Sequence, residues 1–110
     1  MAVLVLAAGC IHPIGKSPLN QAEGWNFLRS QDPAHLDAAI RDDYHDYIQK
    51  LPKKQKRAAT LINLFADGTG RHAVTIEFSL DGTNWTHVLI YDKENKRVKV
   101  VKYVSGHYMS

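Results

Sequence analysis

The sequence predicts an α+β domain in which one or two helices are followed by a four-stranded antiparallel β-meander. The spacing of apolar residues changes from a period of about 3.6 before Ala58 to a period of about 2 after it. Three short polar turns, at Asp67-Gly68, Asp81-Gly82-Thr83 and Asp92 to Asn95, then separate four apolar runs. Because a meander leaves one sheet face open unless another element covers it, we expect the main helix to pack against that face.

Two segments carry signals for the start of a helix. Ser17-Pro18 has the form of an N-cap followed by proline in the first turn, and it predicts a short helix that ends at about Leu28. Asp32-Pro33 repeats this signal and begins the main predicted helix, which runs from Pro33 to Leu51. The residues expected to cover the sheet recur at helical spacing on one face of this helix: Leu36, Ile40, Tyr44, Tyr47, Ile48 and Leu51.

The four predicted strands follow the main helix, and their residue ranges are 60–65, 74–80, 85–91 and 98–104. The second has the clearest alternation of apolar and polar residues, whereas the third is apolar on both faces, as is typical of a central strand. For the last hairpin we expect a three-residue loop, Lys93 to Asn95, that places Asp92 opposite Lys96. Asn95 is expected to adopt a positive φ in this loop.

The register of the last hairpin decides which residues face away from the helix. Continued from the predicted loop, it places Ile90 opposite Val98 and Trp85 opposite Tyr103. The residues expected beneath the helix are Val74, Ile76, Phe78, Val88, Ile90, Val98 and Val100. The opposite face then carries an aromatic set that forms the candidate binding surface: Trp85, His87, Tyr91 and Tyr103, with Glu77 beside them. The alternative is that the first helix or the N-terminal segment covers this face.

Length and composition exclude several classes of site. A chain of 110 residues has room for one domain, and its single cysteine excludes an intrachain disulfide and a multi-cysteine zinc site. The six histidines have no metal-ligand spacing, so we expect no metal and no other cofactor. The net charge is a mild +3, and basic residues cluster in two groups, 50–57 and 93–102, of which the first has no interleaved aromatic residue. This pattern favours a solvated loop and a lysine-protected edge strand over a nucleic-acid interface.

Catalytic patterns are poor, and we expect no enzymatic activity. No serine lies in a nucleophile elbow, and Asp42-Asp43 are adjacent, so their carboxylates point in different directions. The best pair for a hydrolase is Glu77 with His87, and it requires the two side chains to lie within hydrogen-bond reach.

The N-terminal residues point to a location rather than to an activity. Val3 to Ala8 are hydrophobic or small, and they lead into Gly9-Cys10. The stretch Leu6-Ala7-Ala8-Gly9-Cys10 resembles the lipobox of bacterial lipoproteins. The resemblance implies a signal-like segment at 1–9 that is cleaved before Cys10, acyl chains on Cys10, a tether at 10–17 and a single domain at 18–110. The alternative is a buried first strand from Ala2 to Ala8, with Cys10 as an ordinary buried thiol.

The lipobox resemblance implies a protein of the bacterial cell envelope, anchored to the membrane by lipid and facing the periplasm. The order of elements is similar in outline to small periplasmic lipoproteins, and Val74 to Tyr108 looks like part of small uncharacterised bacterial proteins, which brings no activity with it. We therefore expect a non-catalytic module that binds another envelope protein or is structural. The alternative is a cytoplasmic or secreted soluble module that binds a small ligand with Trp85 and Tyr103.

Overall fold

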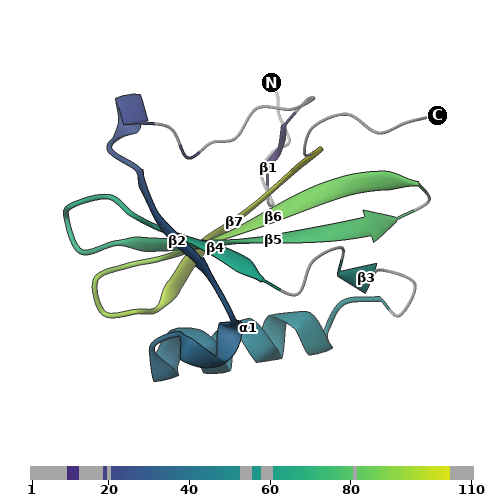
Figure 1. Ribbon diagram of the computed structural model, residues 1–110, viewed down its shortest axis with the longest axis horizontal. Coiled ribbons are helices and arrows are strands. Elements are labelled where there is room, and N and C mark those ends of the chain that lie inside the picture. Colours follow the sequence, from purple (N-terminus) through teal and green to yellow (C-terminus); the bar gives the residue numbers. More distant parts are fainter. Residues whose placement is uncertain are drawn as a thin grey trace.

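The computed structural model describes residues 10–12, 19, 21–52, 56–57, 61–80 and 82–104. Its centre is a sheet of five antiparallel strands in the order β7-β6-β5-β4-β2, and one α-helix lies against it (Figure 1). Two short strands extend this sheet: β1 pairs in parallel with β7, and β3 pairs with β5. The predicted α+β class with an antiparallel sheet is confirmed.

The elements have the following bounds. The helical elements are the 3-10 turns η2 (Gln21–Glu23) and η3 (Pro33–His35) and the helix α1 (Ala38–Gln49). The strands are β1 (Cys10–His12), β2 (Asn26–Gln31), β3 (Lys56–Arg57), β4 (Ile62–Ala66), β5 (His72–Leu80), β6 (Thr83–Tyr91) and β7 (Arg97–Val104). The four strands expected in the meander are β4 to β7, and they pair in chain order.

The first predicted helix is wrong. Among the described residues of this stretch only η2 is helical, and Gly24 ends it with a φ of +91° and a hydrogen bond from its N–H to the carbonyl of Gln21. The chain then extends as β2, which pairs with β4 and contains a bulge at Leu28, between the paired residues Phe27 and Arg29. Pairing with the free edge of β4 outweighs the local signal at Ser17-Pro18, which lies outside the described residues.

The main predicted helix is divided into η3 and α1. Asp32 caps the 3-10 turn through Oδ1, which accepts a hydrogen bond from the Ala34 N–H at 2.8 Å. Leu36 is extended, and Asp37 then caps α1 by accepting from the Ala39 N–H at 3.1 Å. The expected apolar face is confirmed where Leu36, Ile40 and Tyr44 are buried against the sheet.

The loop of the last hairpin forms as predicted, but the register beyond it does not. The Asp92 N–H donates to the Lys96 carbonyl at 2.9 Å, and Asn95 has a φ of +63°. Tyr91 then pairs with Arg97 and Ile90 pairs with Lys99, so Val98 is a bulge without a partner and is 56% exposed. From this point the pairing is shifted by one residue, and Trp85 lies opposite Val104 instead of Tyr103.

The pairing of β5 with β6 places His87 and Leu89, rather than Val88 and Ile90, beside the α1-facing residues of β5. The bulge at Val98 then decides which residues of β7 share each face, because side chains alternate along a strand. The core on the α1 side contains Leu36, Ile40, Tyr44, Ile62, Leu64, Val74, Ile76, Phe78, Leu89 and Tyr91. The core on the other side contains Leu19, Trp25, Ala73, Val88, Ile90, Val101 and Tyr103. The predicted position beneath the helix is confirmed for the α1-facing residues of β5 and for Val100. It is wrong for Val88 and Ile90, which lie in the opposite core, and for Val98, which is exposed.

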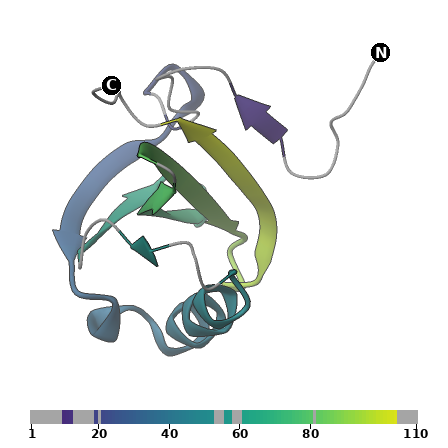
Figure 2. The same ribbon diagram turned by 90° about the vertical axis from the view of Figure 1, so that its right-hand side faces the viewer.

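The sheet is strongly curved. Figure 2 shows β2 and β7 on opposite flanks, with α1 between their lower ends and β1 at the top of the view, away from α1. The expected tether at 10–17 is wrong at its start, since Cys10–His12 pair with Val101, Lys102 and Tyr103. Residues 1–9 and 13–18 lie outside the described residues. None of the helices in the described ranges is long and apolar enough to cross a membrane.

Candidate functional site

The five residues of the expected binding surface do not lie together. His87 and Tyr91 face α1, and Trp85 lies on that same side because it pairs with Phe78. Glu77 and Tyr103 lie on the opposite side of the sheet, since both pair with Thr86. A single aromatic surface that contains both Trp85 and Tyr103 is therefore excluded. The cause is the bulge at Val98, which moved the register of β6 against β7.

The same geometry separates the pair that a hydrolase would need. His87 pairs with Ile76 and shares its face, whereas Glu77 is the next residue along β5 and points the other way. Glu77 is exposed, and His87 is buried beneath α1 with 1% of its surface accessible. The two side chains lie on opposite faces of the sheet, so the hydrolase hypothesis is wrong.

His87 instead forms part of the contact between α1 and the sheet. Its Nδ1 lies 2.7 Å from the Tyr47 hydroxyl, with which it shares a hydrogen bond, and its ring centroid lies 4.4 Å from that of Phe78. Burial, with the positive charge of Lys102, lowers the pKa of His87 to about 4. Burial raises the pKa of Tyr47 to about 12, against the opposing effect of Arg97. Both groups are therefore neutral near pH 7.

A second polar contact fastens the same helix. The Tyr91 hydroxyl donates to Asp43 Oδ2 at 2.8 Å, and Arg97 Nε lies 3.5 Å from that oxygen. The Arg97 guanidinium also lies 5.2 Å above the centre of the Tyr47 ring. Burial, together with the adjacent Asp43, raises the pKa of Tyr91 far above its usual range. These mutually paired groups connect α1 to the sheet, with Tyr91 buried and Asp43 and Tyr47 partly buried.

The opposite face is covered by the segment that precedes β2. Trp25 and Leu19 pack there with Tyr103, which agrees with the alternative that the N-terminal segment covers this face. The Arg71 guanidinium lies 5.0 Å from the centre of the Trp25 ring. At the margin of this core is a shallow hollow of about 300 Å³, lined by Glu23, Trp25, Arg71, Ile90, Val98, Lys99 and Val101.

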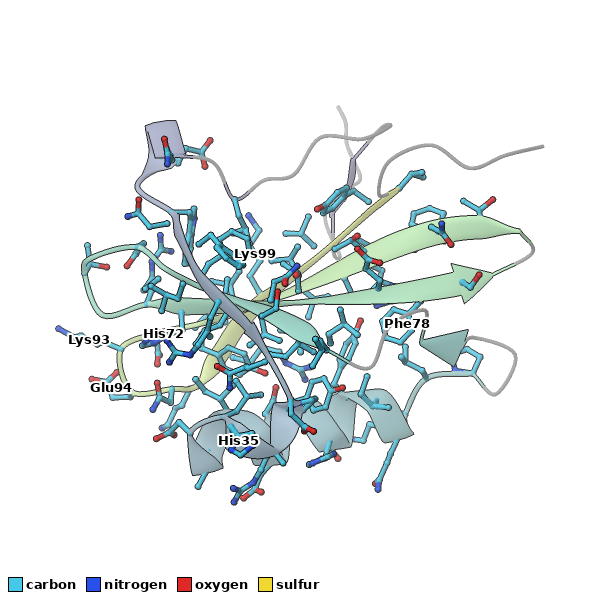
Figure 3. All side chains as sticks on the ribbon, viewed as in Figure 1. His35, His72, Phe78, Lys93, Glu94 and Lys99 are labelled. Carbon is cyan, nitrogen blue, oxygen red and sulfur yellow. The ribbon has the colours of Figure 1, made fainter. Side chains whose placement is uncertain are left out.

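A more polar pocket lies on the α1 side, at the end of the molecule that carries the β6–β7 turn. Its volume is about 210 Å³, and its lining is Arg29, Gln31, His35, Leu36, Asp37, Ile40, Leu64, His72 and Asn95. Figure 3 shows His72 and His35 in the same half of the molecule as Lys93 and Glu94 of the turn, with Phe78 toward the other end. This polar pocket is the candidate functional site.

Among the described residues, one buried side-chain polar atom of the polar pocket has no hydrogen-bond partner in the protein. Arg29 Nε donates to Gln31 Oε1 at 2.9 Å, and Asn95 Nδ2 donates to Asp37 Oδ2 at 3.1 Å. His72 Nδ1 is buried and makes no hydrogen bond. Such orphaned buried polar atoms are rare in folded proteins and mark a place where a partner is missing.

Sequence reasoning missed this pocket because its residues come from separate elements. Arg29 and Gln31 come from β2, for which no strand was predicted, since its first residues were expected to end a helix at about Leu28. His72 precedes the expected start of its strand at residue 74. The only available signal was the number of histidines, which was tested for metal spacing alone. Among the described residues, no three His, Cys, Asp or Glu side chains are placed to hold a metal ion.

Cys10 is the first residue of β1, which lies at the outer edge of the sheet beside β7. Its backbone pairs with Val101, and Ile11 and His12 continue the parallel pairing with β7.

No protein-family model matches the chain, and no curated protein or solved structure is significantly similar to it.

Proposed function

We propose that the protein is a small non-catalytic lipoprotein of the bacterial cell envelope, anchored through acyl chains on Cys10. The observation that carries the proposal is the pairing of Cys10–His12 with β7, taken with the lipobox-like residues before it. In this arrangement the acylated residue is the first residue of an edge strand, and no flexible tether separates the anchor from the sheet. The domain is then held close to the bilayer surface.

Cleavage before Cys10 is compatible with the fold. Each described element begins at Cys10 or later, so removal of residues 1–9 leaves all of them intact. Acyl chains contribute about 0.8 kcal/mol per buried methylene, and two or more chains together give stable anchoring.

The charge of the same sheet edge supports a position beside a membrane. β1 pairs with β7, and the turn and strand that lead to this pairing carry the exposed side chains of Lys93, Lys96 and Lys99. Each lysine near an anionic bilayer contributes about 1 kcal/mol of attraction. These charges also protect the part of β7 that β1 does not cover from pairing with other chains.

The burial of the titratable groups supports a non-catalytic role. His87, Tyr47 and Tyr91 are occupied in holding α1, and Glu77 is separated from His87 by the sheet. We therefore propose that the domain acts by binding, with another envelope protein as the expected partner.

The proposal is tested by expressing the wild type and Cys10→Ala with the complete N-terminus in a bacterial host. We expect wild type in the carbonate-washed membrane pellet, with an intact mass that begins at Cys10 and includes the acyl chains. Cys10→Ala should keep its N-terminal segment and lack the acyl mass. His12→Ala, two residues further along β1, is the matched control and should be processed like wild type. A wild-type protein that retains Met1 and an unmodified thiol would overturn the proposal.

A further inference from the structure

We propose that the polar pocket between η3 and the sheet binds a small monocarboxylate with a short aliphatic chain. The inference goes beyond membrane anchoring, because it concerns a different part of the fold and holds whether or not Cys10 is acylated. It stands on the unpaired donors of the pocket, on its one compensated carboxylate and on its apolar floor.

The unpaired donors favour an anion. Arg29 uses only Nε toward a protein acceptor, so the terminal amino groups of its guanidinium remain for a ligand. His72 Nδ1 is buried in the same lining and has no partner, and it is a donor in the tautomer that carries the proton on Nδ1. A carboxylate fits such a set well, since it accepts two parallel hydrogen bonds from a guanidinium and has further lone pairs for an imidazole N–H.

Asp37 is the single carboxylate in the lining, and its own partners balance part of its negative charge, so it does not neutralise Arg29. Asp37 Oδ2 accepts hydrogen bonds from the Asn95 side chain and from the Ala39 N–H at the start of α1. The positive end of the helix dipole lies at this same position and offsets the charge of Asp37. The charge left for a ligand to balance is therefore that of Arg29.

The bulge in β2 aims Arg29 at the pocket. Arg29 pairs with Leu64 and Gln31 pairs with Ile62, and both partners face α1. Leu28 is the extra residue that places this half of β2 in that alternation, and it is itself exposed. A bulge that redirects a side chain is typical of a functional position in an edge strand.

The floor and size of the pocket define the rest of the ligand. Leu36, Ile40 and Leu64 are buried core residues whose few exposed atoms line the pocket, so the small floor beneath a short hydrocarbon chain is apolar. The volume of about 210 Å³ is below the roughly 300–1,000 Å³ of pockets for drug-sized ligands. Inorganic phosphate would satisfy the donors but leave this floor uncovered, so we favour the carboxylate.

The test is an NMR titration of the purified, isotopically labelled full chain with sodium butyrate at constant ionic strength. We expect saturable shifts of the Arg29 side-chain and His72 imidazole resonances. n-Butylammonium, which has the same chain and the opposite charge, should cause no saturable shift. Sodium phosphate should bind at least tenfold more weakly than butyrate.

Variants tie the binding to the named donors. Arg29→Gln and His72→Gln should each weaken butyrate binding by about tenfold or more, which corresponds to about 1.4 kcal/mol. Lys93→Gln makes the same change in charge as Arg29→Gln on the nearby turn, outside the lining, and should keep the wild-type affinity. Arg29→Lys keeps the charge but loses the planar fork, so it should bind between wild type and Arg29→Gln.

Three results would overturn the inference. One is the absence of saturation with butyrate, and another is equal butyrate affinity in Arg29→Gln and Lys93→Gln. The third is phosphate binding as tight as that of butyrate, which would indicate an anion site without a role for the apolar floor. None of these results bears on the acylation of Cys10, which is measured by fractionation and mass.

Discussion

The buried imidazole of His87 makes the stability of the domain dependent on pH. In the unfolded chain a histidine has a pKa of about 6.5, whereas burial, with the charge of Lys102, lowers the pKa of folded His87 to about 4. Between these values the unfolded chain holds a proton that the folded chain does not. The contribution of neutral His87 to the free energy of unfolding is therefore complete above about pH 6.5, and it is lost as the pH falls toward about 4.

The size of the effect follows from the same two values. Each pH unit over which the unfolded chain holds the extra proton costs about 1.4 kcal/mol, so the interval from 6.5 to about 4 corresponds to about 3 kcal/mol. This is a large part of the roughly 5–15 kcal/mol that stabilises a typical domain. The contact with Tyr47 does not remove the cost, since its hydroxyl is neutral and cannot balance an imidazolium charge.

The measurement is urea unfolding followed by tryptophan fluorescence, because buried Trp25 becomes exposed on unfolding. Wild type and His87→Gln are compared from about pH 7.5 to about pH 4. Glutamine cannot titrate but can still bond to Tyr47, so wild type should lose about 3 kcal/mol more than the variant over this range. His35→Gln, which alters an exposed histidine, should retain the wild-type slope. Parallel pH profiles for wild type and His87→Gln would refute the assignment of His87 as a neutral core group.

Three further predictions test the packing of the sheet. Tyr91→Phe removes the hydrogen bond to Asp43 and should lower the free energy of unfolding by about 1–2 kcal/mol in urea titrations. The control Tyr103→Phe, whose hydroxyl makes no such bond, should lower it by less than half of that, and equal losses would contradict the role of Asp43. Val98→Ala at the exposed bulge should change stability by less than about 0.5 kcal/mol, and Val88→Ala in the core by about 2 kcal/mol. Similar losses in the two variants would instead favour the register predicted from the sequence, in which both residues are buried beneath the helix. Asp67→Ala should lower Tm by a few degrees, because Asp67 accepts hydrogen bonds from Thr69 and Arg71 that shape the β4–β5 turn. Asp32→Ala at the cap of η3 is the comparison. An unchanged Tm for Asp67→Ala in circular dichroism would show that the turn keeps its shape without the carboxylate.

Much of the fold is predictable because it rests on short-range signals. The strands β4 to β7 follow from alternation, and the loop Lys93 to Asn95 follows from turn chemistry that depends on a few adjacent residues. β2 was missed because its strand is stabilised by pairing with β4 and because Gly24 ends the helical turn early. The bulge at Val98 was missed because an apolar residue at that position fits either register.

The candidate binding residues were predicted less well than the strands, because side chains on a strand have only two directions and two registers were wrong. The pairing of β5 with β6 turns His87 and Tyr91 toward α1, and the bulge at Val98 places Tyr103 on the face opposite Trp85. The polar pocket lies beyond this kind of reasoning. It requires β2, η3 and the β6–β7 turn to converge, and those contacts depend on the whole curved sheet.

His72 and His87 show what distinguishes a structural polar residue from a candidate ligand-binding one in this fold. Both lie on the α1 side of the sheet, on neighbouring strands. His87 has a partner in Tyr47 and is enclosed by Phe78, so its polar requirement is met within the protein. His72 Nδ1 has no partner, and the nearby guanidinium of Arg29 is only partly used. Since a buried polar atom without a protein partner is rare, His72 Nδ1 and the terminal amino groups of Arg29 are the groups through which the proposed carboxylate would bind.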